Sequence, residues 1–527
     1  MVGFKLHLLS RSARLAIGTF FSILGTTTLL GGMLAADALA RDGVVATDAI
    51  APSLDPHKNL GSAGALFSSN VFNSLIGVNQ TPKDGRGRHI PELATAWNVA
   101  KDGKSIEFTL RQNVFFHNGQ AVTAEDVKFS IERAIAPETK NPMRSSWLNN
   151  IVSADVLSPT RVAIRLSNPW AGTLDAIAAR GQIVPKAYLA EVGDAGFVKQ
   201  PIGTGPFAFV SMRPGDRIEF KAFDRYWEGK SQFDKLTWRA ISDVNTRVAM
   251  LASGEADAIT DVPPSLVGLV RSNGGQVVNL RGGFQRFFFI NNMRGGPLAD
   301  QRVRMALNIS VDRNAVFKAI FGGEVPMLNG PLSSHQIGGD SVKPYPYDPE
   351  RARKLLADAG YPNGFSTELI YTPGRFADEG ELLPSFASYW KRVGITVALK
   401  PLEYQQWLET ASKKAYPAML SFSKGAGIVA DPLSAFDRHV NCDSLYSSYC
   451  NKELSALVNS SRGIIDPKRL TEIFSRAQRM AQEDAAQVFL YDLPFIMAWK
   501  KGLTWRSEYG TDLNGSWLLL TDADAKK

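Results

Sequence analysis

The sequence is poor in cysteine and in the short motifs that mark enzymes. Its 527 residues include two cysteines and none of the patterns GxSxG, HExxH, CxxC or GxxxxGK[ST]. Those patterns mark hydrolase nucleophiles, zinc peptidases, redox dithiols and phosphate-binding loops. The histidines beyond residue 40 stand singly along the chain: His57, His89, His117, His335 and His439. These absences argue against an enzyme, so we predict no catalytic residue, no metal and no cofactor.

Long apolar runs and charge of one sign are also missing from most of the chain. Beyond residue 40 no stretch approaches the roughly 18 apolar residues of a membrane-spanning helix. Basic and acidic residues are interleaved. The formal net charge of +8 becomes +6 when the three basic residues and one acid of residues 1–40 are subtracted. Without a long basic stripe, the sequence predicts no contact with nucleic acid.

The first 40 residues have the layout of a secretory signal peptide. Basic residues up to Arg14 precede an apolar stretch at 15–34, and the small residues Ala38 and Ala40 follow it. We expect cleavage after Ala40 and a mature chain in the periplasm. An uncleaved membrane anchor is the alternative. A lipoprotein is excluded because no cysteine lies near the cut.

Export bears on the interpretation of the two cysteines. Cys442 and Cys450 lie eight positions apart and would reach an oxidising compartment, where a short disulfide loop is the natural pairing. A loop of this size stabilises a fold by about 2–3 kcal/mol in the chain-entropy account. A zinc site would need more soft ligands than His439 alone supplies. We therefore predict a disulfide bond.

The stretch HNGQAVTAEDVKFSIERAI at 117–135 gathers a histidine, three carboxylates and an arginine. Catalytic groups are one explanation, and the start of a helix is the other. Thr123 and Asp126 have the spacing of a capping box, and acids favour the positive end of a helix. We expect a helix after Thr123 that buries Val127 and Ile131, because no partner group for catalysis is placed nearby.

Strand-like alternation and helical periodicity follow one another along much of the chain. IEFTLR at 106–111 alternates like a half-buried strand. A later stretch has Asp348 as N-cap, Pro349 in the first turn and Gly360 as its stop. Repeated strand–helix–strand order predicts an α/β fold, and the length predicts two or three domains.

Five stretches of the chain carry a family resemblance, and they occur in the family's order. They are PELATAWNVAKDGKSIEFTLRQNVFFHNGQAVTAEDVKFSIERA at 91–134, PIGTGPFAFV at 201–210 with DRYWEGK behind it, DQRVRMALNISVDRNAV at 300–316, YDPERARKLLADAGYPNGF at 347–365, and DPLSAF at 431–436. Together they resemble the extracellular solute-binding proteins of family 5, the oligopeptide- and dipeptide-binding class of ABC importers.

The resemblance implies a two-lobed periplasmic binding protein fold of the α/β class, with an extra α+β subdomain on one lobe. The chain would cross between lobes near Leu280 and near Phe489. The implied parts are a signal peptide at 1–40, lobe I at 41–75, 190–280 and 490–527, its extra subdomain at 76–189, and lobe II at 281–489.

The resemblance also suggests ligand-facing residues. In peptide-binding relatives an arginine shortly after a Thr-Pro turn holds the ligand carboxylate, and YTPGRF places Arg375 within a residue of that place. A surface loop arginine is the alternative. The loop LGSAGA, with Ser62 and Ala63, resembles the ligand-facing loop of the other lobe, where small residues let backbone groups approach a ligand. A plain flexible loop explains it equally well.

One family feature is missing from the chain. Relatives hold a peptide's amino terminus with an aromatic residue and an aspartate three positions later. Here Phe422 takes the aromatic place, Gly425 takes the aspartate's place, Lys424 adds a positive charge, and Asp431 follows six residues after Gly425. The amine anchor is absent or displaced, so Arg375 and Lys424 suit an acidic cargo.

We predict a monomeric periplasmic solute-binding protein that captures a peptide or peptide-like solute by hinge closure. It would deliver that solute to an ABC permease and its ATPase subunits at the inner membrane. A non-peptide cargo is the alternative: an opine-like conjugate, a modified amino acid or a metal chelate. A secreted hydrolase is the rival from another class. It lacks a nucleophile motif, and acid pairs such as Asp378–Glu379 are interpreted as exposed helix residues.

Overall fold

The fold described here is that of a computed structural model. It describes residues 42–522, and Arg41–Lys527 form one unit, separate from Met1–Ala40. The ranges outside the described residues are 1–41, 59–66, 79–88, 143, 145–147, 232, 324, 335, 374–377, 426–430, 445, 505–520 and 523–527. The predicted signal peptide therefore lies outside the described residues.

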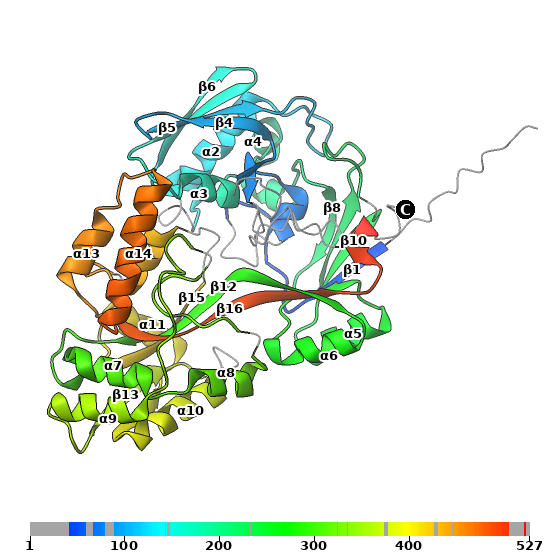
Figure 1. The fold of residues 1–527 in the computed structure, drawn as a ribbon. Helices are drawn as coiled ribbons and strands as arrows, with labels where there is room; N and C mark the ends of the chain where they lie inside the picture. The colour runs from blue at the N-terminus through cyan, green and yellow to red at the C-terminus, as the bar shows by residue number, and fades with distance from the viewer. Residues whose placement is uncertain are drawn as a thin grey trace, which may run out of the picture. The chain divides into compact units, whose positions relative to one another are not determined.

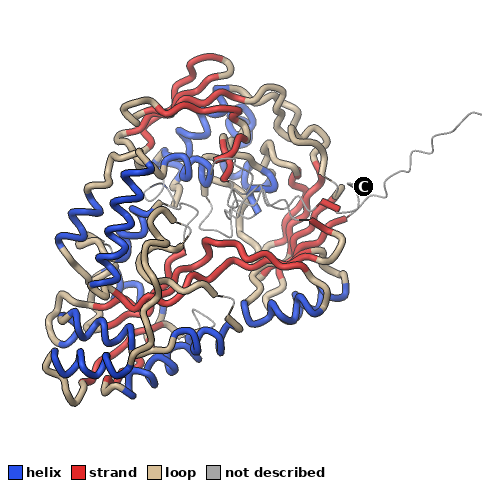
Figure 2. The backbone as a smooth tube through the Cα atoms, in the orientation of Figure 1, coloured by secondary structure: helices blue, strands red, loops and turns tan. Residues whose placement is uncertain are grey.

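A ten-stranded sheet runs through the fold and appears as the long red band in Figure 2. Its strands, in spatial order, are β14 (Ile395–Pro401), β13 (Phe365–Tyr371), β15 (Met419–Gly425), β12 (Gln276–Ile290), β16 (Gln487–Trp499), β11 (Ala258–Ile259), β1 (Asp42–Thr47), β10 (Lys235–Ala240), β9 (Arg217–Ala222) and β8 (Phe207–Arg213). Parallel pairs occur on both sides of β12 and β16, which pair antiparallel. This mixture confirms the predicted α/β class.

The two halves of this sheet are joined through β12 and β16. The register of this pair shifts between Leu280 and Phe284, which lie opposite Phe495 and Leu493. Residues 281–283 therefore oppose a single residue, a proline, which lacks the N–H that a regular ladder needs. On one side of the shift β12 pairs with β15, and on the other β16 pairs with β11. The ladder is thus interrupted where the two halves meet.

A separate four-stranded antiparallel sheet is built from residues 94–166. Its order is β4 (Ala94–Val99), β5 (Ser105–Leu110), β7 (Arg161–Leu166) and β6 (Ile151–Ser158). The helix α2 (Ala124–Ile135) packs on it, as Figure 1 shows. Thr123 and Asp126 form the capping box that the sequence predicted, and Val127 and Ile131 are buried. The carboxylates of this stretch therefore initiate a helix, as expected.

The remaining elements are short strands and the helices that cover the sheets. The strands are β2 (Ile76–Val78), β3 (His89–Pro91), β17 (Leu503–Thr504) and β18 (Thr521–Asp522). The helices are α3 (Thr173–Arg180), α4 (Lys186–Lys199), α5 (Val244–Ser253), α6 (Val267–Ser272), α7 (Gln301–Ile309), α8 (Arg313–Phe321), α9 (Pro349–Asp358), α10 (Glu379–Arg392), α11 (Tyr404–Ser412), α12 (Pro432–His439), α13 (Lys452–Asn459) and α14 (Pro467–Glu483). Short 3₁₀ turns are η1 (Pro137–Thr139), η3 (Pro264–Leu266) and η4 (Pro297–Ala299).

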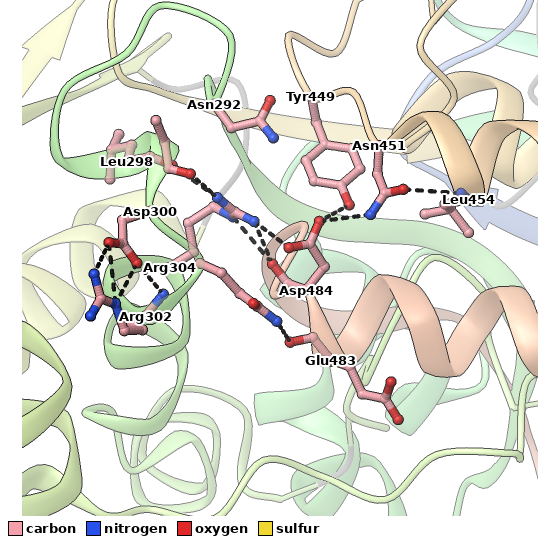
Figure 3. A network of polar contacts seen from close by, with 12 residues as sticks. Asn292, Leu298, Asp300, Arg302, Arg304, Tyr449, Asn451, Leu454, Glu483 and Asp484 are labelled. Atoms are coloured by element: carbon pink, nitrogen blue, oxygen red, sulfur yellow. Dashed lines mark hydrogen bonds and ion pairs between the residues drawn. The ribbon is translucent and has the colours of Figure 1, made fainter. Parts of the chain in front are cut away.

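The predicted disulfide is present, and a buried polar network lies beside it. Cys442 and Cys450 are bonded. Figure 3 shows the network, in which Arg304 of α7 is 2% exposed and pairs with Asp484 at the end of α14. The same carboxylate accepts a hydrogen bond from Tyr449, next to Cys450. Arg304 also donates to the backbone oxygens of Leu298, Ala299 and Asp484. The loop and two helices are thereby fixed to one another.

Candidate functional site

The loops that follow β13 and β15 leave the large sheet at one edge. The two strands pair in parallel, with Leu369 opposite Met419, so their carboxyl ends point the same way. One loop begins after Tyr371 and the other after Gly425. Ligands of open α/β sheets bind beyond such carboxyl ends. This edge is therefore the candidate binding edge in this half of the fold.

Several predicted ligand-facing residues belong to loops that the structure does not describe. Arg375, Ser62 and Ala63 lie outside the described residues. The backbones of Lys424 and Gly425 form the end of β15. The strands that precede these loops end at the same edge, at Tyr371 and Gly425, and the roles of Arg375 and Lys424 as ligand contacts stay predictions.

Phe422 lies inside an aromatic cluster at this edge. Its ring stacks on Trp407 at 5.2 Å and on Phe287 at 5.7 Å between centroids. It also contacts Tyr446 at 5.3 Å and Phe289 at 4.7 Å. The side chain is partly buried. Phe422 therefore fixes the end of β15 through ring packing, and only its remaining surface is open to a ligand.

A buried charge cluster joins β12 to the start of α10. Arg286 of β12 is 1% exposed and sits opposite Ser423 in the ladder. Its guanidinium donates to Phe422 O at 3.2 Å and lies 3.3 Å from a Glu379 carboxylate oxygen. Asp378, which accepts a hydrogen bond from Tyr491, lies 3.8 Å away. The start of α10 is thus tied to β12 and β16.

The acid pair of this cluster corrects one expectation. Glu379 does begin helix α10, but it is 4% exposed rather than solvent-facing. Burial raises the pKa of its carboxyl, and Arg286 opposes that effect. The signal available in the sequence was Arg286 itself, which precedes the four apolar residues FFFI at the end of β12. A charge buried there needs a partner from elsewhere in the chain.

Asp431 is buried at the start of α12. Its carboxylate caps the helix by accepting from the N–H groups of Leu433 at 3.1 Å and Ser434 at 3.3 Å. It also accepts from the indole N–H of Trp170 at 2.9 Å. Burial raises the pKa of Asp431 to about 6, and the nearby Asp175 acts in the same direction. Both carboxylate oxygens are therefore engaged by protein groups.

A cavity of about 1120 Å³ opens beside Asp431. One wall comes from β4 and the segment entering α3, including Trp170 and Asp175. The other comes from α12, the turn before α14, and α14, including Leu433 and Phe474. His89 lies 2.8 Å from Asp175 on the first wall. The cavity is thus mostly apolar, with a few polar groups at its margin.

We also searched the described residues for metal-binding groups and for membrane-spanning helices. Within 42–522, outside the undescribed gaps, no group of three His, Cys, Asp or Glu side chains is arranged to hold a metal ion. Over the same part of the chain, none of the helices combines the length and apolar character of a membrane span.

Comparison with known proteins identifies the family. Residues 88–446 match the bacterial extracellular solute-binding proteins, family 5, middle region. The chain belongs to this family. Its function is that of a solute-binding protein for an ABC importer, as the sequence predicted. Members of the family are periplasmic binding proteins and not enzymes.

Several individual proteins resemble the chain over most of its length. The glutathione-binding protein GsiB of Salmonella paratyphi A is 27% identical, with 88% of this chain and 91% of GsiB covered. HbpA2 of Haemophilus parasuis superimposes with a TM-score of 0.79 at 23% identity, covering 92% of this chain and 100% of HbpA2. AgaA of A. tumefaciens R10, solved with agropinic acid, gives 0.70 at 26% identity, covering 90% and 96%. These likenesses confirm the two-lobed periplasmic binding protein fold.

Proposed function

We propose that this family 5 protein captures an acidic, peptide-like solute of roughly tripeptide size and delivers it to an ABC permease. The observation that carries the proposal is the likeness to GsiB, which is described as glutathione-binding and aligns over nearly the full length of both chains. Glutathione is a tripeptide with two carboxylates. A cargo of that kind agrees with the charges predicted for the binding edge.

The charges at the binding edge support an acidic cargo. Arg375 and Lys424 would supply two cations near the carboxyl ends of β13 and β15, and charge-assisted contacts are among the stronger polar contacts available to a ligand. Gly425 stands where relatives carry an amine-binding aspartate. We propose that Asp431 does not replace it, since its oxygens already accept from Trp170 and from the first turn of α12.

Capture would proceed by closure of two lobes about the interrupted β12–β16 ladder. We propose lobe I at 41–75, 190–280 and 490–527, with the extra subdomain at 76–189, and lobe II at 281–489. The register shift at residues 281–283 supports this hinge, because a strand pair lacking regular hydrogen bonds bends at lower cost. The working form would be a monomer, exported and cut after Ala40.

An opine-like conjugate is the second candidate cargo. AgaA, whose structure holds agropinic acid, is 26% identical to this chain over 90% of its length. Agropinic acid also carries a carboxylate, so Arg375 and Lys424 would serve it equally. The two cargo classes differ in their amide bonds and in the presence of a sugar-derived part.

A thermal-shift panel separates these possibilities. The panel holds reduced glutathione, its diethyl ester, neutral and acidic di- and tripeptides, and agropinic acid. We expect glutathione or an acidic tripeptide to raise the unfolding midpoint and its ester to fail. A ligand at about 100 times its Kd adds about 2.7 kcal/mol to the free energy of unfolding. A shift with agropinic acid alone would select the second candidate. Hydrolysis of any panel peptide would contradict both.

A further inference from the structure

One hydrogen bond joins two parts of the fold that are otherwise built separately. Trp170 precedes α3 and is partly buried against the core of the four-stranded sheet. Its indole N–H donates to Asp431 at 2.9 Å, although the two residues are 261 positions apart. Asp431 begins α12, which packs with α13 and α14. In Figure 1, α3 lies near one end of α14.

The two sides of this bond do not share a hydrophobic core. Among the described residues, the cluster under the four-stranded sheet draws on residues between Leu75 and Trp227, and the cluster around α12–α14 on residues between Leu328 and Phe489. No buried apolar residue belongs to both clusters. Because packed apolar area supplies most of the cost of separation, these two sides can part without opening either core.

The surroundings of the bond indicate a contact that closes and opens. The cavity beside it is lined by three unusually exposed apolar side chains: Val99 at 36% on one side, and Ile337 at 38% and Ile465 at 41% on the other. Apolar groups on both faces of a water-filled gap gain from closer approach. The indole–carboxylate bond is the polar contact at the margin of this gap.

The Asp431 carboxylate can lose the indole N–H without losing its other hydrogen bonds. Asp431 keeps its hydrogen bonds to the first turn of α12 whether or not the indole is present. When Trp170 withdraws, water can take the place of its N–H. The helix start therefore survives separation, and the bond costs α12 nothing when it breaks.

We propose that Trp170 and Asp431 form a reversible tie between the four-stranded subdomain and lobe II that stabilises the closed, cargo-bound arrangement. The inference rests on the proposed closure of the lobes. In this role both are positioning residues. They raise the population of the closed form and slow cargo release without touching the cargo, since a contact made only in one state shifts the equilibrium toward that state.

The first test measures the lobe separation directly. Spin labels are placed at Leu157→Cys on β6 and Glu472→Cys on α14, both exposed, since the native cysteines are bonded to each other. Pulsed dipolar spectroscopy then gives the distance distribution with and without reduced glutathione. Trp170→Phe keeps the ring and removes the donor. We expect it to move the distribution toward longer distances, with unchanged thermal stability of the ligand-free protein.

A matched control and a kinetic readout make the test specific. Trp97→Phe alters the same subdomain at a tryptophan that does not line the cavity, and we expect the wild-type distribution. Trp170→Phe should speed glutathione release about 3- to 10-fold and leave the association rate unchanged. Asp431→Asn retains an acceptor oxygen and should keep the wild-type distances.

Two failures are distinguishable. A Trp170→Phe distribution identical to wild type, both with and without glutathione, would overturn the tie. A wild type that binds no compound of the panel would instead overturn the proposed function. A distance change in the ligand-free Trp170→Phe protein would still support the tie in that case, because it needs no cargo.

Discussion

Two carboxylates, Asp484 and Asp431, illustrate two ways in which this fold uses a long-range polar contact. Asp484 meets Arg304 between two apolar clusters that share Tyr345, and the guanidinium also donates to three backbone oxygens. Asp431 receives a single N–H from across a gap, beside a cavity of about 1120 Å³. The first contact cannot open without unfolding its surroundings, whereas the second can. The number of hydrogen-bond partners therefore distinguishes the two contacts. We call the Arg304–Asp484 contact the permanent joint and the Trp170–Asp431 contact the movable contact.

Breaking the permanent joint should have the largest effect. Asp484→Ala leaves Arg304 buried without its charge partner, and such changes cost about 3–5 kcal/mol of unfolding free energy. Chemical denaturation measures the loss. Glu350→Ala removes the partner of Arg353 at an exposed site and should cost about 0–1 kcal/mol. Equal losses of unfolding free energy in the two variants would contradict the expected difference between the Arg304–Asp484 pair and the exposed Arg353–Glu350 pair.

The disulfide next to the Arg304–Asp484 pair should contribute less to the free energy of unfolding than that pair does. Replacing Cys442 and Cys450 together by serine opens a nine-residue loop, and we expect a loss of about 2–3 kcal/mol. The measurement is again chemical denaturation, with the reduced wild type as a second comparison. Because Tyr449 and Asn451 keep their bonds to Asp484, the loop should stay in place. A loss equal to that of Asp484→Ala would show that the network depends on the disulfide.

Removing a side chain that contacts the cargo should lower the affinity more than removing the Trp170–Asp431 bond does. Arg375→Ala should weaken glutathione binding by about 1.5–3 kcal/mol, about 10- to 100-fold, with stability unchanged. Arg375→Lys should recover part of this, because a single ammonium cannot make a bidentate contact. Calorimetric titration measures both, with the exposed Arg353→Ala as control. Wild-type affinity in Arg375→Ala would remove this residue from the site.

The pH dependence of stability should reveal the buried charge at the movable contact. Burial raises the pKa of Asp431 to about 6 from 3.8, so the native state binds its proton more tightly than the unfolded chain does. The ionised carboxyl then destabilises the fold above pH 6, and this cost disappears as pH falls toward 4. Asp175, paired with His89, faces the same cavity and adds to the effect.

Asp431→Asn isolates this contribution from the other titrating groups. At pH 7.5 the variant should be more stable than wild type by at most about 2–3 kcal/mol, and the difference should vanish near pH 4. Thermal and chemical unfolding at several pH values measure it. A difference that grows as pH falls would mean that the carboxylate is held in its ionised form, against the sign expected here.

Local features of this fold were predictable from the sequence because neighbouring residues determine them. The capping box of Thr123 and Asp126 and the bond between Cys442 and Cys450 each join residues less than ten positions apart. The α/β class followed from periodicity, and the two-lobed form followed from the family resemblance.

Contacts between distant segments were not predictable in the same way. Arg286 meets Glu379 across 93 positions, and Trp170 meets Asp431 across 261. Nothing near either residue in the sequence identifies its partner, since the crossing of β12 and the packing of two separate cores bring them together. The sequence singled out Asp431 through its position in the family motif and predicted a ligand contact, which stays a prediction. The helix cap and the cross-fold bond that the structure shows were not predicted.

Small-angle X-ray scattering of the mature chain shows whether the two lobes close on a bound solute. The protein is measured alone and with a saturating amount of reduced glutathione, or of the panel compound that raises its thermal midpoint most. We predict a smaller radius of gyration with the ligand bound, because the lobes would close about the β12–β16 interruption. Proven binding with an unchanged radius of gyration would contradict it.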